Sequence, residues 1–328
     1  DLHSFPTRRS SDLVLKANRI ILRRETTAAE NHQRSVQEKY DAEQRKIDEA
    51  HKWAVLMNFG NTAGAPIKPP NPFEDELAQA NWRVSDLAKL NELAGVMEED
   101  GSGGYVTGAD GKPRHHYQLL TLEVPEEYDK DVKAAVAVGD VDRASNIATM
   151  VPGIGNTVRN GMGGMVNNAE ALRTAAGADE TAVVAWIGYD TPQGFLEFDS
   201  NGSQTDYMTP ERADEGAPAL NGFEEGLHTW HQRQGVDPNL TVHAHSYGSL
   251  TAGTALMDTK TGVVDAAQFH GSPGARATDA HQWNVPYGHM YASANGLDFV
   301  AGIGPDNAFG NDFGPDPRQV PGVGKIQY

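Results

Sequence analysis

One stretch decides how this chain can fold, and it reads Leu240-Thr241-Val242-His243-Ala244-His245-Ser246-Tyr247-Gly248-Ser249-Leu250. An apolar, β-prone run leads into Ser246, which small residues flank, and a helix-prone run to Met257 follows. A strand that reverses sharply into a helix holds its turn residue in a strained, exposed conformation, where bulky neighbours would collide with the facing backbone. The pattern predicts a nucleophile elbow, which presents a serine hydroxyl near the positive end of a helix. Ala244 stands where the usual Gly-x-Ser-x-Gly pattern has its first glycine, which is a mild departure. Because so short a pattern also arises by chance in many chains, a plain structural turn is the alternative.

Length and composition describe a chain that can build a sizeable core. Its 328 residues are enough for one large domain and a smaller region. It contains no cysteine, which excludes disulfides, a thiolate nucleophile and cysteine-ligated zinc. No apolar run approaches the ~20 residues of a membrane span, and no secretory signal is visible. The compartment stays open between the cytoplasm and secretion without a signal peptide.

Acidic residues are concentrated after the first sixty positions. The net charge is −18, but residues 1–60 carry a balance of +2 and the remainder −20. Such a negative field repels phosphate backbones, so we expect no nucleic acid partner for the main domain.

The N-terminal part divides into an end that looks foreign and a helical region. Residues 1–13 resemble translated sequencing-adaptor sequence and are set aside as a non-native end. Residues 14–60 are almost free of glycine and proline and predict a long amphipathic, coiled-coil-like helix. This helix would pack against another helix or a partner chain, or it would lean on the main domain as a charged, solvated helix. Its expected apolar stripe comprises Val36, Tyr40, Ile47, Ala50, Ala54 and Met57.

The rest of the chain predicts a linker and then a larger domain. Residues 61–75 are rich in proline and read as a linker, and residues 76–328 form the main domain. A helix is expected over 73–97. Short apolar runs then alternate with helix-like segments, which predicts a mainly parallel sheet with helices on both faces. The candidate strands are Tyr117–Glu123, Ala134–Val138, Ile147–Val151, Ala182–Ile187, Leu240–His243, Val263–Phe269 and His289–Ala292.

Five segments together resemble a known family. In order and spacing they are similar to an actinobacterial α/β-hydrolase family of unknown function, whose members often carry a helical, WXG-like region ahead of the hydrolase domain. The resemblance runs from about Leu119 to the C-terminus and implies the α/β-hydrolase fold. The segments are Ala148–Gly155, Thr181–Asp190, Asp214–Leu220, His245–Ser249 and Gly271–Gly274.

The resemblance implies roles for particular residues. Ser246 matches the nucleophile, and the backbone amides of the Gly153–Ile154 loop and of Tyr247 would form the oxyanion hole. Asp298 would be the acid of the triad, with Asp190 as the runner-up. The family's histidine lies in a His-Ser motif near its C-terminus, beyond Tyr328. The chain is therefore expected to be a fragment that lacks its general base and is inactive without it.

The other histidines and the glycine loop offer weaker alternatives. His245, His270 and His289 are less suitable bases, because the histidine of this fold follows the last strand. His243 and His245 with the pair at 115–116 could bind a metal, but strand packing explains His243, and no metal is expected. Dinucleotide binding at Gly153-Ile154-Gly155 is disfavoured, since Val158 stands where the third glycine would be, so no cofactor is expected.

The leading interpretation is a serine hydrolase, esterase- or lipase-like, that cleaves an ester or related acyl bond of a small-molecule or lipid substrate through an acyl-enzyme. One alternative is a partner-binding protein whose residues 14–60 dock to a helical partner or a type VII secretion component, with the hydrolase domain as a scaffold. Another is a phage-type esterase acting on mycolyl or other cell-envelope lipids.

Overall fold

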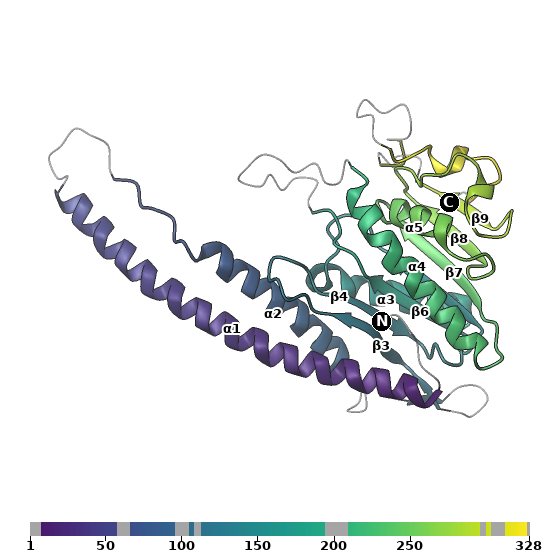
Figure 1. The fold of residues 1–328 in the computed structure, drawn as a ribbon, viewed down its shortest axis with the longest axis horizontal. Coiled ribbons are helices and arrows are strands. Elements are labelled where there is room, and N and C mark those ends of the chain that lie inside the picture. The colour runs from purple at the N-terminus through teal and green to yellow at the C-terminus, as the bar shows by residue number, and fades with distance from the viewer. Residues whose placement is uncertain are drawn as a thin grey trace.

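The computed structural model describes residues 8–57, 66–95, 105–107, 113–193, 209–295, 300–302 and 312–326. Within these ranges, one mixed sheet forms the centre of the molecule, with strand order β10-β9-β8-β7-β5-β6-β4-β3 (Figure 1). Strands β5 to β10 pair in parallel, and β4 pairs antiparallel with both β3 and β6. The sheet strands are β3 (Tyr117–Glu123), β4 (Lys133–Val138), β5 (Asn146–Val151), β6 (Thr181–Ile187), β7 (Asn239–His245), β8 (Ala266–His270), β9 (Met290–Ser293) and β10 (Gly324–Lys325).

Helices cover both faces of the sheet, as Figure 1 shows. The remaining elements are α1 (Arg8–Met57), α2 (Glu74–Gly95), α3 (Gly163–Ala176), α4 (Glu211–Gln232) and α5 (Gly248–Asp258), the π-helical turn η1 (Val158–Met162), the 3-10 turns η3 (Ala280–Gln282), η4 (Val300–Gly302) and η5 (Pro317–Gln319), and a separate hairpin of β1 (Tyr105–Thr107) and β2 (Pro113–His115). The predicted fold class, a mainly parallel sheet between helices and preceded by a helical region, is confirmed.

The buried side chains of the central strands divide between two cores, because successive residues of a strand point to opposite faces. Val184 and Trp186 of β6 lie in the core under α4 and α5. Val183 and Ala185, which alternate with them, lie in the core under α1, α2 and α3. All seven residues of β6 are buried, which is the burial expected for a central strand with helices on both faces.

The N-terminal helix α1 and the shorter α2 pack side by side, and α1 extends well beyond the sheet (Figure 1). The buried face of α1 repeats every seven residues, at Leu15, Leu22, Ala29 and Val36. The predicted stripe is correct at Val36 and Ile47, but its last members are exposed, and Met57 is 85% exposed. The cause is that α2 begins only at Glu74, so no helix among the described residues lies beside the far end of α1.

The described part of the proline-rich segment lies along α1. Asn71 donates from its side-chain amide to the carbonyl oxygen of Tyr40 at 3.0 Å, and Lys68 forms an ion pair with Asp48 at 2.5 Å. At the other end of α1, the buried Asn18 donates to the carbonyl oxygens of Leu119 and Leu120. These contacts tie α1 to the segment that leads into α2 and to the edge strand β3. Among the described helices, none is long and apolar enough to cross a bilayer.

Candidate active site at the carboxyl edge of the sheet

The turn between β7 and α5 holds Ser246 in a left-handed backbone conformation. Its φ is 54°, and among the described residues only Arg276 shares a positive φ without being a glycine. A non-glycine residue in this region costs on the order of 1–3 kcal/mol, so the surrounding structure must hold it there. The Ser246 amide donates to the carbonyl oxygen of His270 at 2.9 Å, and the Ser249 hydroxyl lies 2.5 Å from the Ser246 carbonyl oxygen.

Small residues around Ser246 are required by close backbone approach. A Cβ built on Gly153 would lie 2.7 Å from the Cβ of Ser246 and 3.1 Å from its Oγ. A Cβ on Gly248 would collide with the carbonyl oxygens of Pro152 and Val151. The loop after β5 and the turn after β7 therefore touch through their glycines.

This contact lies where the order of the strands reverses. From β5 the chain passes to β6 on one side and later returns to β7 on the other. Where the connections after two neighbouring strands run in opposite directions, a crevice opens between the two loops. Ligands of open α/β sheets bind in this crevice. Gly153 and Ser246 thus stand at the expected position for a site.

Two carbonyl groups of the loop after β5 are held by a side chain of the same loop. The Asn156 side-chain amide donates to the carbonyl oxygens of Gly153 and Ile154, at 3.1 and 3.0 Å. Because the N–H and C=O of a trans peptide point in opposite directions, the Ile154 N–H points away from Asn156. The next amide, that of Gly155, is already used, since it donates to Pro192 at 2.8 Å. Among the hydrogen bonds of the described residues, none uses the Ile154 amide as a donor, so this amide is available to a ligand.

Tyr247 anchors the start of α5 from within the core. Its side chain is buried, and its hydroxyl donates to the carbonyl oxygen of Thr209 at 2.6 Å and accepts from the amide of Ala213 at 3.3 Å. Burial raises the pKa of this hydroxyl, so it stays a neutral donor. Tyr247 is the N-cap residue of α5, so its backbone N–H lies at the amino end of the helix, where amides have no partner within the helix.

The histidines near Ser246 lie on the sheet face opposite α5. The rings of His243 and His270 are stacked with their centroids 6.2 Å apart, and the Nδ1 of His270 lies 2.9 Å from the Ser293 Oγ. Burial lowers the pKa of His243 to about 4, and His270 adds to the shift, so His243 is neutral at pH 7. A cavity of about 260 Å³ opens on this face, lined in part by His243, Gln268 and Tyr291.

The other sequence-predicted residues contact groups other than Ser246 or lie outside the described ranges. Asp298 falls outside the described residues. Asp190 forms an ion pair with Lys133 at 3.3 Å. His289 occupies the opposite end of its strand and contacts the carbonyl oxygen of Asp265. His116 stacks edge-on against Tyr117 at the far edge of the sheet, so it cannot join His243 and His245 around one metal.

Sequence reasoning missed the residues that hold the loop after β5. Besides Asn156, these include Tyr189, whose hydroxyl donates to the carbonyl oxygen of Pro152 at 2.7 Å, and Thr191, which donates to the carbonyl oxygen of Asn156. The available signal was the asparagine after Gly-x-Gly, since asparagine side chains commonly bond to nearby backbone groups in turns.

A parallel sheet between helices, with a serine at positive φ after a central strand, defines an α/β protein of the hydrolase type. A family model described as alpha/beta hydrolase matches residues 128–308, and the chain belongs to this family.

The chain is also similar to other proteins and to solved structures. An uncharacterized protein of Mycobacterium bovis is 33% identical over 218 residues, which is 63% of this chain and 76% of that protein. An uncharacterized protein of Mycobacterium tuberculosis is 32% identical over 178 residues, 52% of this chain and 26% of that protein. A lidless a/b serine hydrolase from Xanthomonas campestris is similar at 14% identity and a TM-score of 0.38, covering 64% of this chain and 84% of its own. The Trichoderma reesei cutinase is similar at 12% identity and a TM-score of 0.35, covering 80% and 90%.

Proposed function

We propose that the chain is the catalytic domain of a serine hydrolase that cleaves an ester or related acyl bond, with Ser246 as the nucleophile. One observation carries the proposal: Ser246 is held at φ 54° between a central strand and a helix, against a glycine of the neighbouring loop. Strained backbone of this kind is retained where the surrounding structure imposes it, and it concentrates at active sites. A plain structural turn would not need a serine here, because glycine adopts the same conformation without cost.

The reaction follows from the groups around this serine. The Ser246 Oγ attacks the acyl carbon, its proton passes to a general base, and the alcohol leaves with that proton. Water then hydrolyses the serine ester by the same route. The negative charge on the acyl oxygen would be stabilised by the amides of Ile154 and Tyr247, and Gly153 leaves room for the oxygen to approach.

As the family resemblance implies, Asp298 would supply the carboxylate of the triad, and a histidine beyond Tyr328 would be the general base. His270 is the alternative within the chain, because His289, the other histidine considered, lies at the opposite end of its strand. The substrates are small-molecule or lipid acyl compounds, with cell-envelope lipids as one possibility.

Labelling with a fluorophosphonate tests this proposal. The full-length protein should be labelled at Ser246, as mapped by peptide mass spectrometry, and Ser246→Ala should lose the label. Ser145→Ala is the matched control, because this exposed serine precedes β5 at the opposite edge of the sheet. If the full-length protein neither reacts with the probe nor hydrolyses short-chain p-nitrophenyl esters, the proposal is wrong.

A second candidate function, docking of a helical protein partner through α1, has one observation in its favour. The far end of α1 exposes Trp53, Leu56 and Met57, and the returning chain adds Ile67, which is 93% exposed. Contiguous exposed apolar side chains mark interaction sites. Crosslinking and size-exclusion chromatography of the chain and of Trp53→Ser/Leu56→Ser test it, and a monomeric, uncrosslinked wild type would count against it.

A further inference from the structure

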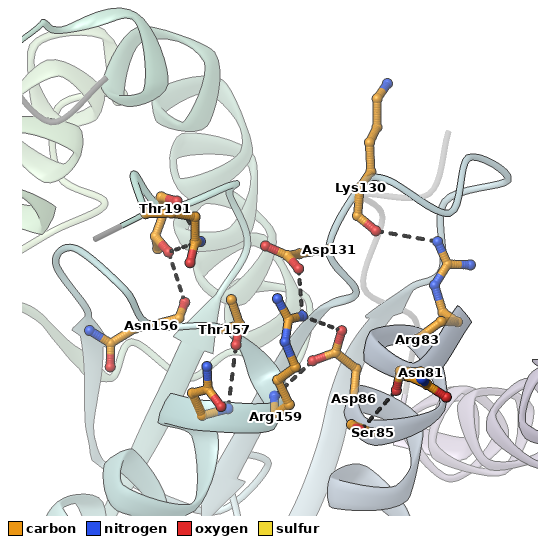
Figure 2. Close-up of polar contacts among 12 residues, drawn as sticks. Asn81, Arg83, Ser85, Asp86, Lys130, Asp131, Asn156, Thr157, Arg159 and Thr191 are labelled. Carbon is orange, nitrogen blue, oxygen red and sulfur yellow. Dashed lines mark hydrogen bonds and ion pairs between the residues drawn. The ribbon is translucent and has the colours of Figure 1, made fainter. Parts of the chain in front are cut away.

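A buried carboxylate of the N-terminal helices contacts the backbone just beyond the loop that faces Ser246. Asp86, on α2, is 1% exposed. Its Oδ1 accepts a hydrogen bond from the backbone amide of Arg159 at 2.7 Å, and its Oδ2 accepts from the Nη1 of the same residue at 2.9 Å (Figure 2). Both oxygens of the Asp86 carboxylate therefore accept hydrogen bonds from Arg159. This fixes the position of the Arg159 backbone as well as of its charged side chain.

Arg159 is the second residue of η1, so Asp86 acts on the first turn of this helical segment. The first amides of a helix lack partners within the helix, and a carboxylate placed there satisfies and orients them. Thr157 satisfies the next amide, since its side chain accepts from Asn160 at 3.3 Å. The Arg159 guanidinium also contacts Asp131 at 2.6 Å and lies over the ring of Trp82. Burial opposes the charge of Arg159, but Asp86 and Asp131 outweigh it and raise its pKa.

The turn η1 is in turn packed against the residue that holds the loop. A Cβ built on Gly161 would lie 2.6 Å from the Oδ1 of Asn156, so η1 lies in contact with this side chain. Asn156 fixes the carbonyl oxygens of Gly153 and Ile154 from the side away from Ser246. Figure 2 shows Asp86, Arg159, Thr157 and Asn156 in this order from right to left, with Thr191 above Asn156.

We propose that Asp86 is a positioning residue for the loop 153–156: by holding the start of η1 it holds Asn156, and through Asn156 it sets the direction of the Ile154 amide. The part of this inference that concerns catalysis rests on the proposed function. The contact from Asp86 to the Arg159 backbone, not the ion pair alone, transmits the effect. Asp131 provides the comparison, because it contacts only the guanidinium.

Hydrogen exchange of the chain as it stands tests the positioning without any reaction. Asp86→Ala should speed exchange of the backbone amides in residues 153–157 by at least tenfold. Asp86→Asn should show a smaller change, because the amide oxygen can still accept from the Arg159 backbone. Asp131→Asn should leave this segment within twofold of the wild type. Equal effects of the Asp86→Ala and Asp131→Asn variants, or no change in Asp86→Ala, would overturn the inference.

Inactivation of the full-length protein by a fluorophosphonate adds the catalytic readout. Asp86→Ala should lower the maximal inactivation rate by tenfold or more and leave the half-saturating probe concentration unchanged. The maximal rate of Asp86→Asn should lie between those of the wild type and Asp86→Ala. A change in the half-saturating concentration alone would contradict the assignment. If Asp86→Ala does not fold, the Asp86→Asn and Asp131→Asn variants decide the matter, since only the first should be affected. A wild type that is never labelled refutes the proposed function, and the exchange data then still decide whether Asp86 orders the loop.

Discussion

The α-carbon of Gly153 lies so close to Ser246 that a methyl group on it would come within 3.1 Å of the serine oxygen. The two residues come from loops that follow neighbouring strands, β5 and β7, and each limits the other. The serine can occupy its turn only because its neighbour has no side chain.

We therefore expect Gly153→Ala to slow fluorophosphonate labelling of Ser246 in the full-length protein by at least tenfold. The added Cβ would overlap the Cβ of Ser246, so the loop or the turn must shift. Gly164→Ala is the matched control, because a Cβ there meets nothing within 4 Å on helix α3. Gly164→Ala should label normally and gain about 0.5–1 kcal/mol in stability. Normal labelling of Gly153→Ala would show that the loop yields easily.

The strained backbone of Ser246 predicts that a glycine at this position would make the folded chain more stable. Ser246→Gly should raise the free energy of unfolding by about 1 kcal/mol, because glycine adopts a φ of 54° without strain. Ser246→Ala should bring no such gain, since alanine keeps the Cβ and the strain. Urea unfolding of the three proteins checks this prediction, and equal stability of the two variants would argue against strain at this residue.

Glu224 makes the folded chain less stable as the pH rises. It is 1% exposed on α4, and burial raises its pKa from 4.5 to about 7, with Thr149 opposing the rise. Between about pH 4.5 and 7 the folded chain keeps a proton that the unfolded chain releases, so this residue lowers stability as the pH rises through that window.

Glu224→Gln should remove this contribution and be more stable than the wild type at pH 8, by on the order of 3 kcal/mol. Urea melts between pH 4.5 and 8 measure the difference. Glu225→Gln is the control, because it removes only a surface ion pair with Lys260 and should leave the slope in place. A parallel pH dependence in the wild type and Glu224→Gln would exclude the assignment.

Asn18 links α1 to an irregularity in the sheet. The register of β3 against β4 shifts between Leu119 and Thr121, and Asn18 donates to the carbonyl oxygens of Leu119 and Leu120. Asn18→Ala should destabilise the chain by about 1–3 kcal/mol, because it leaves buried carbonyl groups without a donor. Thermal unfolding should show no comparable effect for Asn31→Ala, an exposed asparagine on the same helix. An effect below about 0.5 kcal/mol for Asn18→Ala would mean that water replaces the amide.

The strands could be predicted from the sequence because their apolar runs are short, continuous and bounded by turn residues. The bounds of β3 were predicted without error. The strand predicted at Val263–Phe269 begins three residues later, at Ala266, so the apolar Val263 and Val264 lie outside β8. The turn at Ser246 was also predicted, because few patterns fit a strand that reverses into a helix. The short pairings of β1, β2 and β10 carry too few residues for a pattern.

The polar support of the loop could not be predicted, because its partners are far apart in the sequence. Asp86 and Arg159 are 73 positions apart, and only the packing of α2 against the sheet brings them together. The exposed end of α1 has the same physical explanation. Its heptad pattern continues past Val36, but the length of the partner helix, which sequence periodicity does not encode, decides where burial stops.

The contacts of α2 change where the hydrolase unit of this chain begins. The family match starts at residue 128, yet Arg83 donates to the carbonyl oxygens of Pro125, Glu127 and Lys130, and Asp86 holds η1. A recombination or truncation boundary placed at the start of the match would uncover the apolar core beneath α2 and release both anchors. A segment exchanged between relatives should therefore include α2 together with the sheet, because α2 covers the core of the sheet and anchors its loops.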